Sequence, residues 1–185
     1  SKPLIYWSIK AALNSKFIDR VVVSTEDKEI AEIARSYKAE VPFIRPSIFA
    51  EDDSLGIEPV IHALKMIPDA QDLILLQPTS PLRETKHIDE IFKLRANNNC
   101  DSAVSVSLSK KNNIFKINSR NELLPISNEF KLLTRQKYND LYTLNGALYL
   151  SKVRKIKENK SSIFYLHTPV ASHLFRLFSI SHSLK

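Results

Sequence analysis

Apolar side chains in the first half of the chain alternate between helical spacing and short uninterrupted runs. Apolar positions three and four residues apart predict helices over residues 4–15, 27–37 and 57–66 and from residue 85 onward. Runs of β-branched and aliphatic residues predict strands over residues 20–25, 41–44, 73–76 and 103–106. Because strands and helices alternate, the pattern predicts an α/β fold built on a parallel sheet.

Local signals refine the ends of these elements. Pro3 lies in the first turn of its helix, where its missing N–H costs nothing. Asp27 and Thr85 are placed to cap the helices that follow them. Residues 73–76 show no polar alternation, so we expect this strand to be fully buried, and we place Trp7 in the core.

The pattern changes after residue 107. Short strand-like segments at residues 113–117 and 146–151 are separated by polar stretches rich in Asn, Lys and Ser. There is no internal repeat and no low-complexity tract, so composition alone gives no domain boundary. We therefore interpret the chain as one domain in which this less regular part is a candidate dimerisation insert.

Composition and charge narrow the class of protein. With 185 residues, 43% of them hydrophobic, the chain can bury one core, which excludes collagen-like, disordered and disulfide-stapled classes. The single cysteine, Cys100, cannot form an intramolecular disulfide, and neither a secretory signal nor a bilayer-spanning run is present, so we expect a cytoplasmic protein. The net charge of +7 is scattered along the chain, which disfavours a nucleic-acid partner and suits an anionic substrate.

Glycine is scarce, although nucleotide-binding α/β folds generally use glycine-rich turns to bring backbone amides against phosphates. Only Gly56 and Gly146 occur, so no phosphate loop is visible. The chain begins at Ser1 and passes directly into the first predicted helix. We therefore expect an upstream strand and loop to be missing.

The most informative motif is Gln-Pro-Thr-Ser-Pro-Leu-Arg at residues 77–83, directly after the predicted strand 73–76. Ligands of open parallel sheets bind outside the carboxyl ends of the strands. Gln77 offers both a donor and an acceptor at this junction, which makes it the first candidate for sugar binding. The alternative is a rigid turn made by two prolines, with Arg83 solvated.

Further motifs occur with this heptapeptide in a recognisable order. They are Lys-Pro-Leu-Ile at 2–5, Val-Val-Val-Ser-Thr at 21–25, Ile-Ala at 30–31, Val-Pro at 41–42, Arg-Pro at 45–46, Ile-His-Ala-Leu at 61–64, and Asn145, Gly146, Ala147 and Tyr149. In this combination the chain resembles the acylneuraminate cytidylyltransferases over about residues 2–169. These enzymes couple CTP to sialic acid and related nonulosonic acids.

The resemblance implies a doubly wound, mostly parallel, Rossmann-like sheet of the nucleotide-diphospho-sugar transferase type, with a small dimerisation insert. It also implies a reaction in which the anomeric hydroxyl of the sugar attacks the α-phosphate of CTP and pyrophosphate leaves. The expected sugar-binding residues are Gln77, Arg135, Asn145 and Tyr149, and the expected nucleotide-binding residues are Arg45 and Asp52. For Arg45 a surface ion pair, and for Asp52 a cap of the helix that begins near residue 57, stay open as alternatives.

Two other reactive side chains are interpreted as structural. His62 lies within a predicted helix and has no nucleophile or second metal-type ligand at suitable spacing, so we expect it to pack or to stabilise the helix. Cys100 follows an asparagine-rich loop without a recognisable histidine partner, which argues against a nucleophile.

The ends of the chain depart from the family pattern. Full members open with a phosphate-wrapping loop and close with aspartates that hold Mg²⁺, whereas this chain begins after the loop and residues 170–185 contain no acidic residue. Residues 170–185 are interpreted as a divergent tail, with a frameshift or a misread coding sequence as the hypothesis for its origin. We therefore identify no catalytic residue and no metal ligand, and we expect impaired activity. The alternative is a non-catalytic remnant that binds sugar or dimerises.

The expected partners follow from the same resemblance. They are CTP and an acidic nine-carbon sugar, with Mg²⁺ as cofactor and a second copy of the chain that packs through about residues 131–164. The heptapeptide at 77–83 favours sialic or legionaminic acid, and the product would feed capsule or lipopolysaccharide synthesis. Neither a membrane nor a nucleic acid is expected as a partner.

Overall fold

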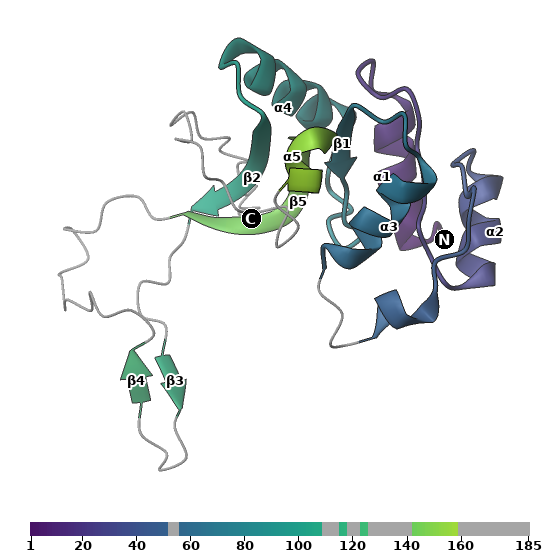
Figure 1. The fold of residues 1–185 in the computed structure, drawn as a ribbon, viewed down its shortest axis with the longest axis horizontal. Helices are drawn as coiled ribbons and strands as arrows, with labels where there is room; N and C mark the ends of the chain where they lie inside the picture. The colour runs from purple at the N-terminus through teal and green to yellow at the C-terminus, as the bar shows by residue number, and fades with distance from the viewer. Residues whose placement is uncertain (52–55, 109–114, 118–122, 126–141, 159–185) are drawn as a thin grey trace, which may run out of the picture. The chain divides into compact units, whose positions relative to one another are not determined.

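The computed structural model describes residues 1–51, 56–108, 115–117, 123–125 and 142–158 (Figure 1). The helices are α1 (Leu4–Leu13), α2 (Lys28–Ser36), the 3₁₀ turn η1 (Ser47–Ala50), α3 (Glu58–Met66), α4 (Thr85–Asn97) and α5 (Val153–Glu158). The strands are β1 (Asp72–Leu75), β2 (Ser102–Leu108), β3 (Phe115–Ile117), β4 (Leu123–Pro125) and β5 (Tyr142–Lys152). The chain separates into two compact units, Ser1–Ser105 with Gly146–His173 and Val106–Asn145 with Leu174–Lys185.

The main sheet has three strands in the order β1-β5-β2, with β5 as the central strand. β1 pairs with β5 in antiparallel register, from Asp72 opposite Lys152 to Leu75 opposite Tyr149. β5 and β2 are antiparallel as well. Lys152 N donates to Asp101 O at 2.9 Å and Leu148 N donates to Ser105 Oγ, so the residue numbers fall along β5 as they rise along β2. The expected α/β class is confirmed, whereas a mostly parallel sheet is not confirmed by these pairings.

Parallel pairing occurs where the first two strands were predicted, but only as an isolated bridge between Val22 and Glu40. Glu40 N donates to Val21 O, and Glu40 O accepts from Val23 N. The next donor along this side of the ladder would be Pro42, which has no N–H, so the ladder is interrupted there. The two segments meet again where Arg45 N donates to Thr25 O at 2.9 Å. The predicted strand at residues 41–44 is therefore wrong, and residues 20–25 contribute a bridge rather than a strand.

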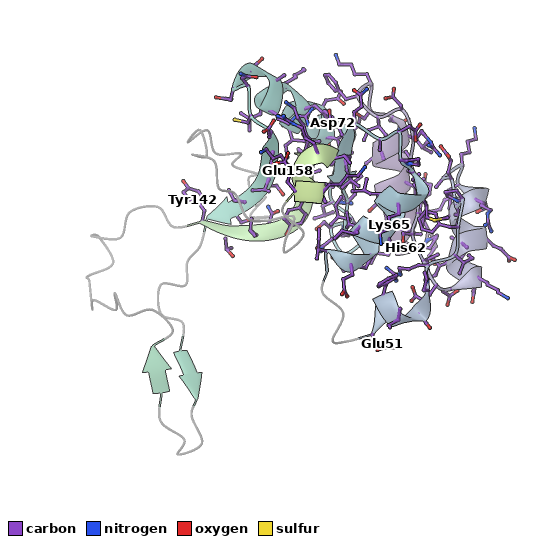
Figure 2. The ribbon with its side chains drawn as sticks, in the orientation of Figure 1. Glu51, His62, Lys65, Asp72, Tyr142 and Glu158 are labelled. Atoms are coloured by element: carbon purple, nitrogen blue, oxygen red, sulfur yellow. The ribbon has the colours of Figure 1, made fainter. Side chains whose placement is uncertain are left out.

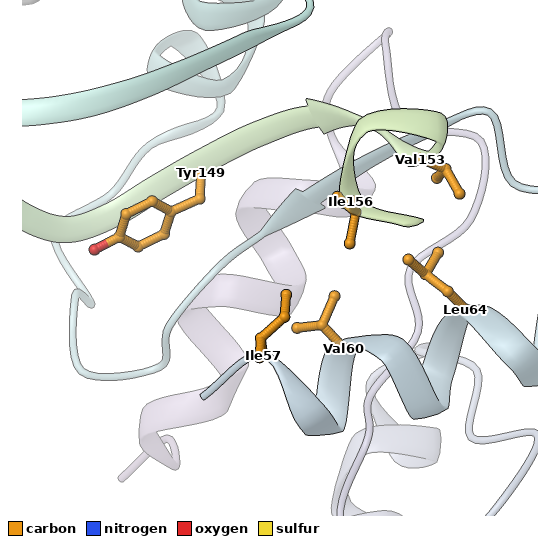
Figure 3. Packing of buried hydrophobic residues seen from close by; sticks show 6 residues of the cluster. All are labelled: Ile57, Val60, Leu64, Tyr149, Val153 and Ile156. Atoms are coloured by element: carbon orange, nitrogen blue, oxygen red, sulfur yellow. The ribbon is translucent and has the colours of Figure 1, made fainter. Parts of the chain in front are cut away.

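Two apolar clusters hold the first unit together. In one, Val60 and Leu64 on one face of α3, with Ile57 at its N-cap, pack against side chains of β5 and α5 (Figure 3). Leu73 and Leu75 of β1 contact the same cluster but are only half-buried, because β1 has a single neighbour in the described sheet. The prediction of a fully buried strand is therefore wrong.

The second cluster joins α1 and α2. Ile9 of α1 lies against Ala31 and Ala34 of α2, and all three are at most 2% exposed. The small side chains on α2 allow the two helices to approach closely. Val21 and Val23 pack against the same group. Apolar contacts therefore fix the extended segment after α1, whose ladder is limited to a single bridge.

The helix starts agree in part with the sequence prediction. Asp27 caps α2, since its Oδ1 accepts from Ile30 N at 3.0 Å. The start of α4 differs, because Glu84 is the N-cap and forms a reciprocal capping box with His87. Thr85 is the first helical residue, and its Oγ1 donates to Ala11 O at 3.0 Å instead. Thr85 thus fastens α4 to α1 rather than capping its own helix.

One side of α1 is less buried than predicted. Trp7 is 43% exposed and meets Tyr6 edge to face at 5.1 Å, so its assignment to the core is wrong. The buried residues of α1 are instead Ile9 and three small residues, Ser8, Ala11 and Ala12, which let neighbouring elements approach the helix backbone.

In the second unit, β3 and β4 form an antiparallel pair with Lys116 opposite Leu124. The segment predicted to mediate dimerisation, residues 131–164, is described only over 142–158, and the tail at 170–185 lies outside the described residues. Within the part of the chain that the structure describes, no helix has the length and apolar character needed to cross a membrane.

The backbone of Gly146 generates a first prediction. Its φ of +74° is one that side chains rarely adopt, and a Cβ there would lie 2.6 Å from Gln77 Oε1. Gly146→Ala should therefore lower the free energy of unfolding by about 1–2 kcal/mol in chemical denaturation. Gly56→Ala is the matched control, because a Cβ at Gly56 meets nothing within 4 Å. Equal effects of the two substitutions would contradict this explanation.

A second prediction concerns Asp101, which directly precedes β2. Its carboxylate accepts hydrogen bonds from Lys152 at the end of β5 and from Arg154 in α5. Hydrogen bonds from these two cations lower the pKa of Asp101 to about 2. The stabilisation is complete above the unfolded pKa of about 3.9 and is lost as the pH falls towards 2.

Asp101→Asn should flatten the loss of stability between about pH 4 and pH 2, with an effect of at most about 1 kcal/mol because the pairs are partly exposed. Thermal unfolding at a series of pH values measures it. Asp19→Asn, at an exposed position, makes the same charge change and should leave that slope unaltered. An unaltered slope in Asp101→Asn would contradict the assignment.

Candidate functional site

The heptapeptide at residues 77–83 folds as two successive turns between β1 and α4. Ser80 N donates to Gln77 O at 3.2 Å, and Arg83 N donates to Ser80 O at 3.2 Å. Pro78 and Pro81 occupy the second position of each turn, where the fixed φ of proline is favourable. The spacing of the two prolines therefore explains the shape of this loop, which we call the Gln77 turn.

The guanidinium of Arg83 closes the Gln77 turn from inside the protein. Nη1 donates to Ala147 O on β5 at 2.6 Å, Nη2 donates to Ser8 Oγ on α1 at 2.6 Å, and both reach Gln77 O at 3.3 and 3.1 Å. Arg83 is 6% exposed, so the alternative of a solvated arginine is wrong. Burial lowers the pKa of Arg83 to about 10, which leaves it protonated at neutral pH.

The side chain of Gln77 reaches the backbone of β5. Its Oε1 lies 2.6 Å from the point that a Cβ on Gly146 would occupy, so this close approach requires glycine. The carbonyl of the same residue is held by Arg83. Arg83 thus fixes the backbone of Gln77, and the side-chain amide of Gln77 has room because Gly146 has no side chain.

Tyr149 lies on β5 with its ring in the cluster formed by Ile57, Val60 and neighbouring apolar residues (Figure 3). It is 6% exposed, and it stands opposite Leu75 in the sheet register. Tyr149 thus has a packing role in this structure, and its role towards a sugar stays a prediction.

Asn145 belongs to the second unit, where its Nδ2 donates to Ser107 Oγ at 3.2 Å. The amide is half-buried on β5, one residue before Gly146. Arg135, the fourth residue assigned to the sugar, lies outside the described residues. The assignments of Asn145 and Arg135 therefore stay predictions.

Of the two residues assigned to the nucleotide, Arg45 is described and Asp52 is not. Arg45 forms an ion pair with Glu26, which was the alternative to a nucleotide contact. The backbone hydrogen bond of Glu26 and then the guanidinium of Arg45 lower the pKa of the Glu26 carboxyl. Among the described residues, the buried Nε of Arg45 has no hydrogen-bond partner, so the ion pair with Glu26 does not satisfy the whole guanidinium.

The two side chains interpreted as structural have surroundings that fit this interpretation. His62 on α3 (Figure 2) lies between Phe43 and Phe49, with ring centroids at 5.1 and 5.3 Å. Cys100 is half-buried, and its Sγ lies 3.3 Å from Asn98 O. Among the described residues, no group of three or more His, Cys, Asp or Glu side chains could hold a metal ion.

Sequence reasoning found Gln77 but missed Ser8, which anchors Arg83 to α1. The signal was present, because Ser8 lies four residues from both Leu4 and Ala12 on the otherwise apolar stripe of a helix. A polar residue on a buried stripe needs a hydrogen-bond partner, and a buried cation needs acceptors. Nothing in the sequence indicated that these two residues would satisfy each other.

The geometry presents an amide with both donor and acceptor capacity at the carboxyl end of β1, on a turn that proline and arginine hold rigid. Such a group can bind a hydroxyl or an acylamino substituent of a ligand. It has no acid, base or nucleophile character of its own. This geometry suits the binding and orientation of a ligand rather than bond-making chemistry.

Comparison with known proteins connects this geometry to a family. Residues 1–173 match the family described as Cytidylyltransferase. The chain is 38% identical over 169 residues to the CMP-N,N'-diacetyllegionaminic acid synthase of Legionella pneumophila, covering 86% of this chain and 71% of that protein. It is 34% identical over 186 residues to the N-acylneuraminate cytidylyltransferase of Escherichia coli O18:K1:H7, covering 98% of this chain and 41% of that protein.

The fold has a solved counterpart in a CMP:2-keto-3-deoxy-manno-octonic acid synthetase complexed with CTP, with a TM-score of 0.58 and 16% identity. The match covers 86% of this chain and 66% of that one, and at this identity it shows the fold alone. The sequence match to the family extends over almost the whole chain and includes the Gln77 turn. The chain therefore belongs to the cytidylyltransferase family, among the acylneuraminate-type enzymes.

Proposed function

We propose that this protein is a cytidylyltransferase that transfers CMP from CTP to a nonulosonic acid of the sialic or legionaminic type. The anomeric hydroxyl oxygen forms a bond to the α-phosphorus of CTP, the bond from that phosphorus to the bridging oxygen breaks, and pyrophosphate leaves with that oxygen. The observation that carries the proposal is the Gln77 turn in a chain that matches the family over residues 1–173.

The described residues supply the sugar side of this reaction. Gln77 would donate to and accept from polar substituents of the sugar, which fixes the direction of the anomeric hydroxyl. Arg45 would approach the nucleotide, and its unsatisfied Nε is consistent with an additional acceptor from a ligand. Phosphoryl transfer depends chiefly on positioning and electrostatics, which is the chemistry that such residues provide.

The relatives favour acidic nine-carbon sugars as substrates. The Legionella protein is named for N,N'-diacetyllegionaminic acid, and the Escherichia protein for N-acylneuraminate. Both names specify acylamino sugars, whose amides suit the donor and acceptor of Gln77. The chain spans 71% of the first relative and less than half of the second, so the activity of the whole protein is part of the proposal.

Magnesium is the cofactor that the family resemblance implies, and none of the described residues is assigned to it. They include no group of three or more His, Cys, Asp or Glu side chains that could hold an ion. Hard oxygen ligands would be required. No step of the proposed reaction is therefore assigned to a metal held by these residues.

Steady-state kinetics tests the proposal through two variants with opposite expectations. Pyrophosphate release is measured with CTP, supplied as its magnesium salt, and with N-acetylneuraminic acid or N,N'-diacetyllegionaminic acid. Gln77→Ala should raise KM for the sugar acid by roughly 10- to 100-fold and leave KM for CTP nearly unchanged. The reason is that a polar substituent of the bound sugar would lose its hydrogen-bond partner. Arg45→Ala should show the reverse selectivity.

The wild-type chain should release pyrophosphate only when a sugar acid is present. Release that does not depend on the sugar, or variants that affect both substrates equally, would contradict the proposed roles. Calorimetric binding of the sugar acid without turnover of CTP would identify the chain as a sugar-binding module instead.

A further inference from the structure

We propose that Arg83 is a positioning residue for the sugar acid: its guanidinium fixes the Gln77 turn against β5, so that the Gln77 amide meets the sugar in one orientation. This inference rests on the proposed role of Gln77 in sugar binding. It adds a residue that touches no substrate and acts through another residue.

The first support is the set of atoms that Arg83 joins. Its two terminal nitrogens reach the carbonyl of Gln77, the carbonyl of Ala147 and the hydroxyl of Ser8, which lie on three different segments of the chain. A planar guanidinium holds several acceptors in a fixed geometry, which a lysine ammonium cannot do. The carbonyl of Gln77 therefore has its place set relative to β5, while the contact with Ser8 fastens the guanidinium to α1.

The second support is the charge of Arg83. It is 6% exposed, and among the described residues it forms no ion pair, so its contacts are with neutral oxygens. Burying a cation without a carboxylate is costly for stability. A neutral side chain would be enough to close a turn. The charged guanidinium of Arg83 forms shorter and more directional hydrogen bonds than a neutral donor.

The third support is the arrangement on the other side of Gln77. The side-chain Oε1 lies 2.6 Å from the point that a Cβ on Gly146 would occupy. Gly146 directly precedes Ala147, whose carbonyl accepts from Arg83 at 2.6 Å. On β5, Ala147 therefore accepts a hydrogen bond from Arg83, and the adjacent Gly146 leaves space for the Gln77 amide. A shift of the turn away from β5 would change both contacts together.

The test uses Arg83→Lys with Ser8→Ala as its matched control. The lysine variant keeps the charge but cannot span the three acceptors, so Gln77 loses its fixed place. Ser8→Ala removes one hydrogen bond from the same guanidinium and keeps those to Gln77 and Ala147. Both variants should unfold at lower denaturant concentration than the wild type, which provides a measure of the purely structural effect.

Kinetics separates positioning from stability. Arg83→Lys should raise KM for the sugar acid by roughly 10- to 100-fold, with KM for CTP nearly unchanged, as expected when a binding group moves by about 1 Å. Ser8→Ala should leave KM for the sugar acid nearly unchanged. The inference is overturned if Arg83→Lys keeps the wild-type KM, if Ser8→Ala raises it equally, or if both KM values rise together.

A spectroscopic readout keeps this inference separate from the proposed function. The side-chain amide protons of Gln77, assigned by their loss in Gln77→Ala, should give two dispersed NMR signals in the wild type and in Ser8→Ala. In Arg83→Lys they should move to the positions of a freely rotating glutamine. Absence of turnover in the wild type would contradict the proposed function, whereas an unchanged Gln77 signal in Arg83→Lys would contradict the role of Arg83.

Discussion

A buried cation with neutral partners is the constraint around which the first unit is arranged. Arg83 lies at the junction of α1, β5 and the Gln77 turn, and each of these elements supplies it with one oxygen. Among the described residues the buried Nε of Arg83 has no hydrogen-bond partner, so its terminal nitrogens carry all the contacts. The three elements therefore cannot shift independently without leaving a further donor unsatisfied. The placement of Gln77 follows from this requirement.

Other features of the fold serve the same junction. Thr85 and Ser15 connect α1 to α4, through Ala11 O and Asp89 Oδ1, so the helix that follows the turn is fastened to the helix beneath it. Phe17 and Phe92 stack between the same two segments with ring centroids 5.4 Å apart. The turn is therefore held at both ends, by β1 in the sheet and by α4 against α1, which gives a candidate ligand-binding loop little freedom.

Much of this architecture could be predicted from the sequence, because it depends on local patterns. The helical spacing gave α1, α2 and α3, and the apolar run at residues 73–76 gave β1 within one residue. Asp27 was recognised as a cap because capping depends on a few neighbouring residues. Gln77 and the two prolines stood out for the same reason.

The errors concern contacts between segments that are distant in the sequence. Thr85 looked like a cap but bonds to α1, and Trp7 looked like a core residue although Ile9 and small residues fill the buried face of its helix. Strand direction was also beyond local patterns, because β5 enters the sheet between β1 and β2 from far along the chain. The environment of Arg83 depends on three such distant segments, so its burial could not be inferred from the heptapeptide.

The most direct test of the account is a crystal structure of the protein with N-acetylneuraminic acid bound. The account predicts that the sugar lies against the Gln77 turn, that the Gln77 amide is within hydrogen-bond distance of a sugar substituent, and that Arg83 still holds the Gln77 carbonyl. A sugar bound elsewhere, with the Gln77 amide directed away from it, would contradict the account.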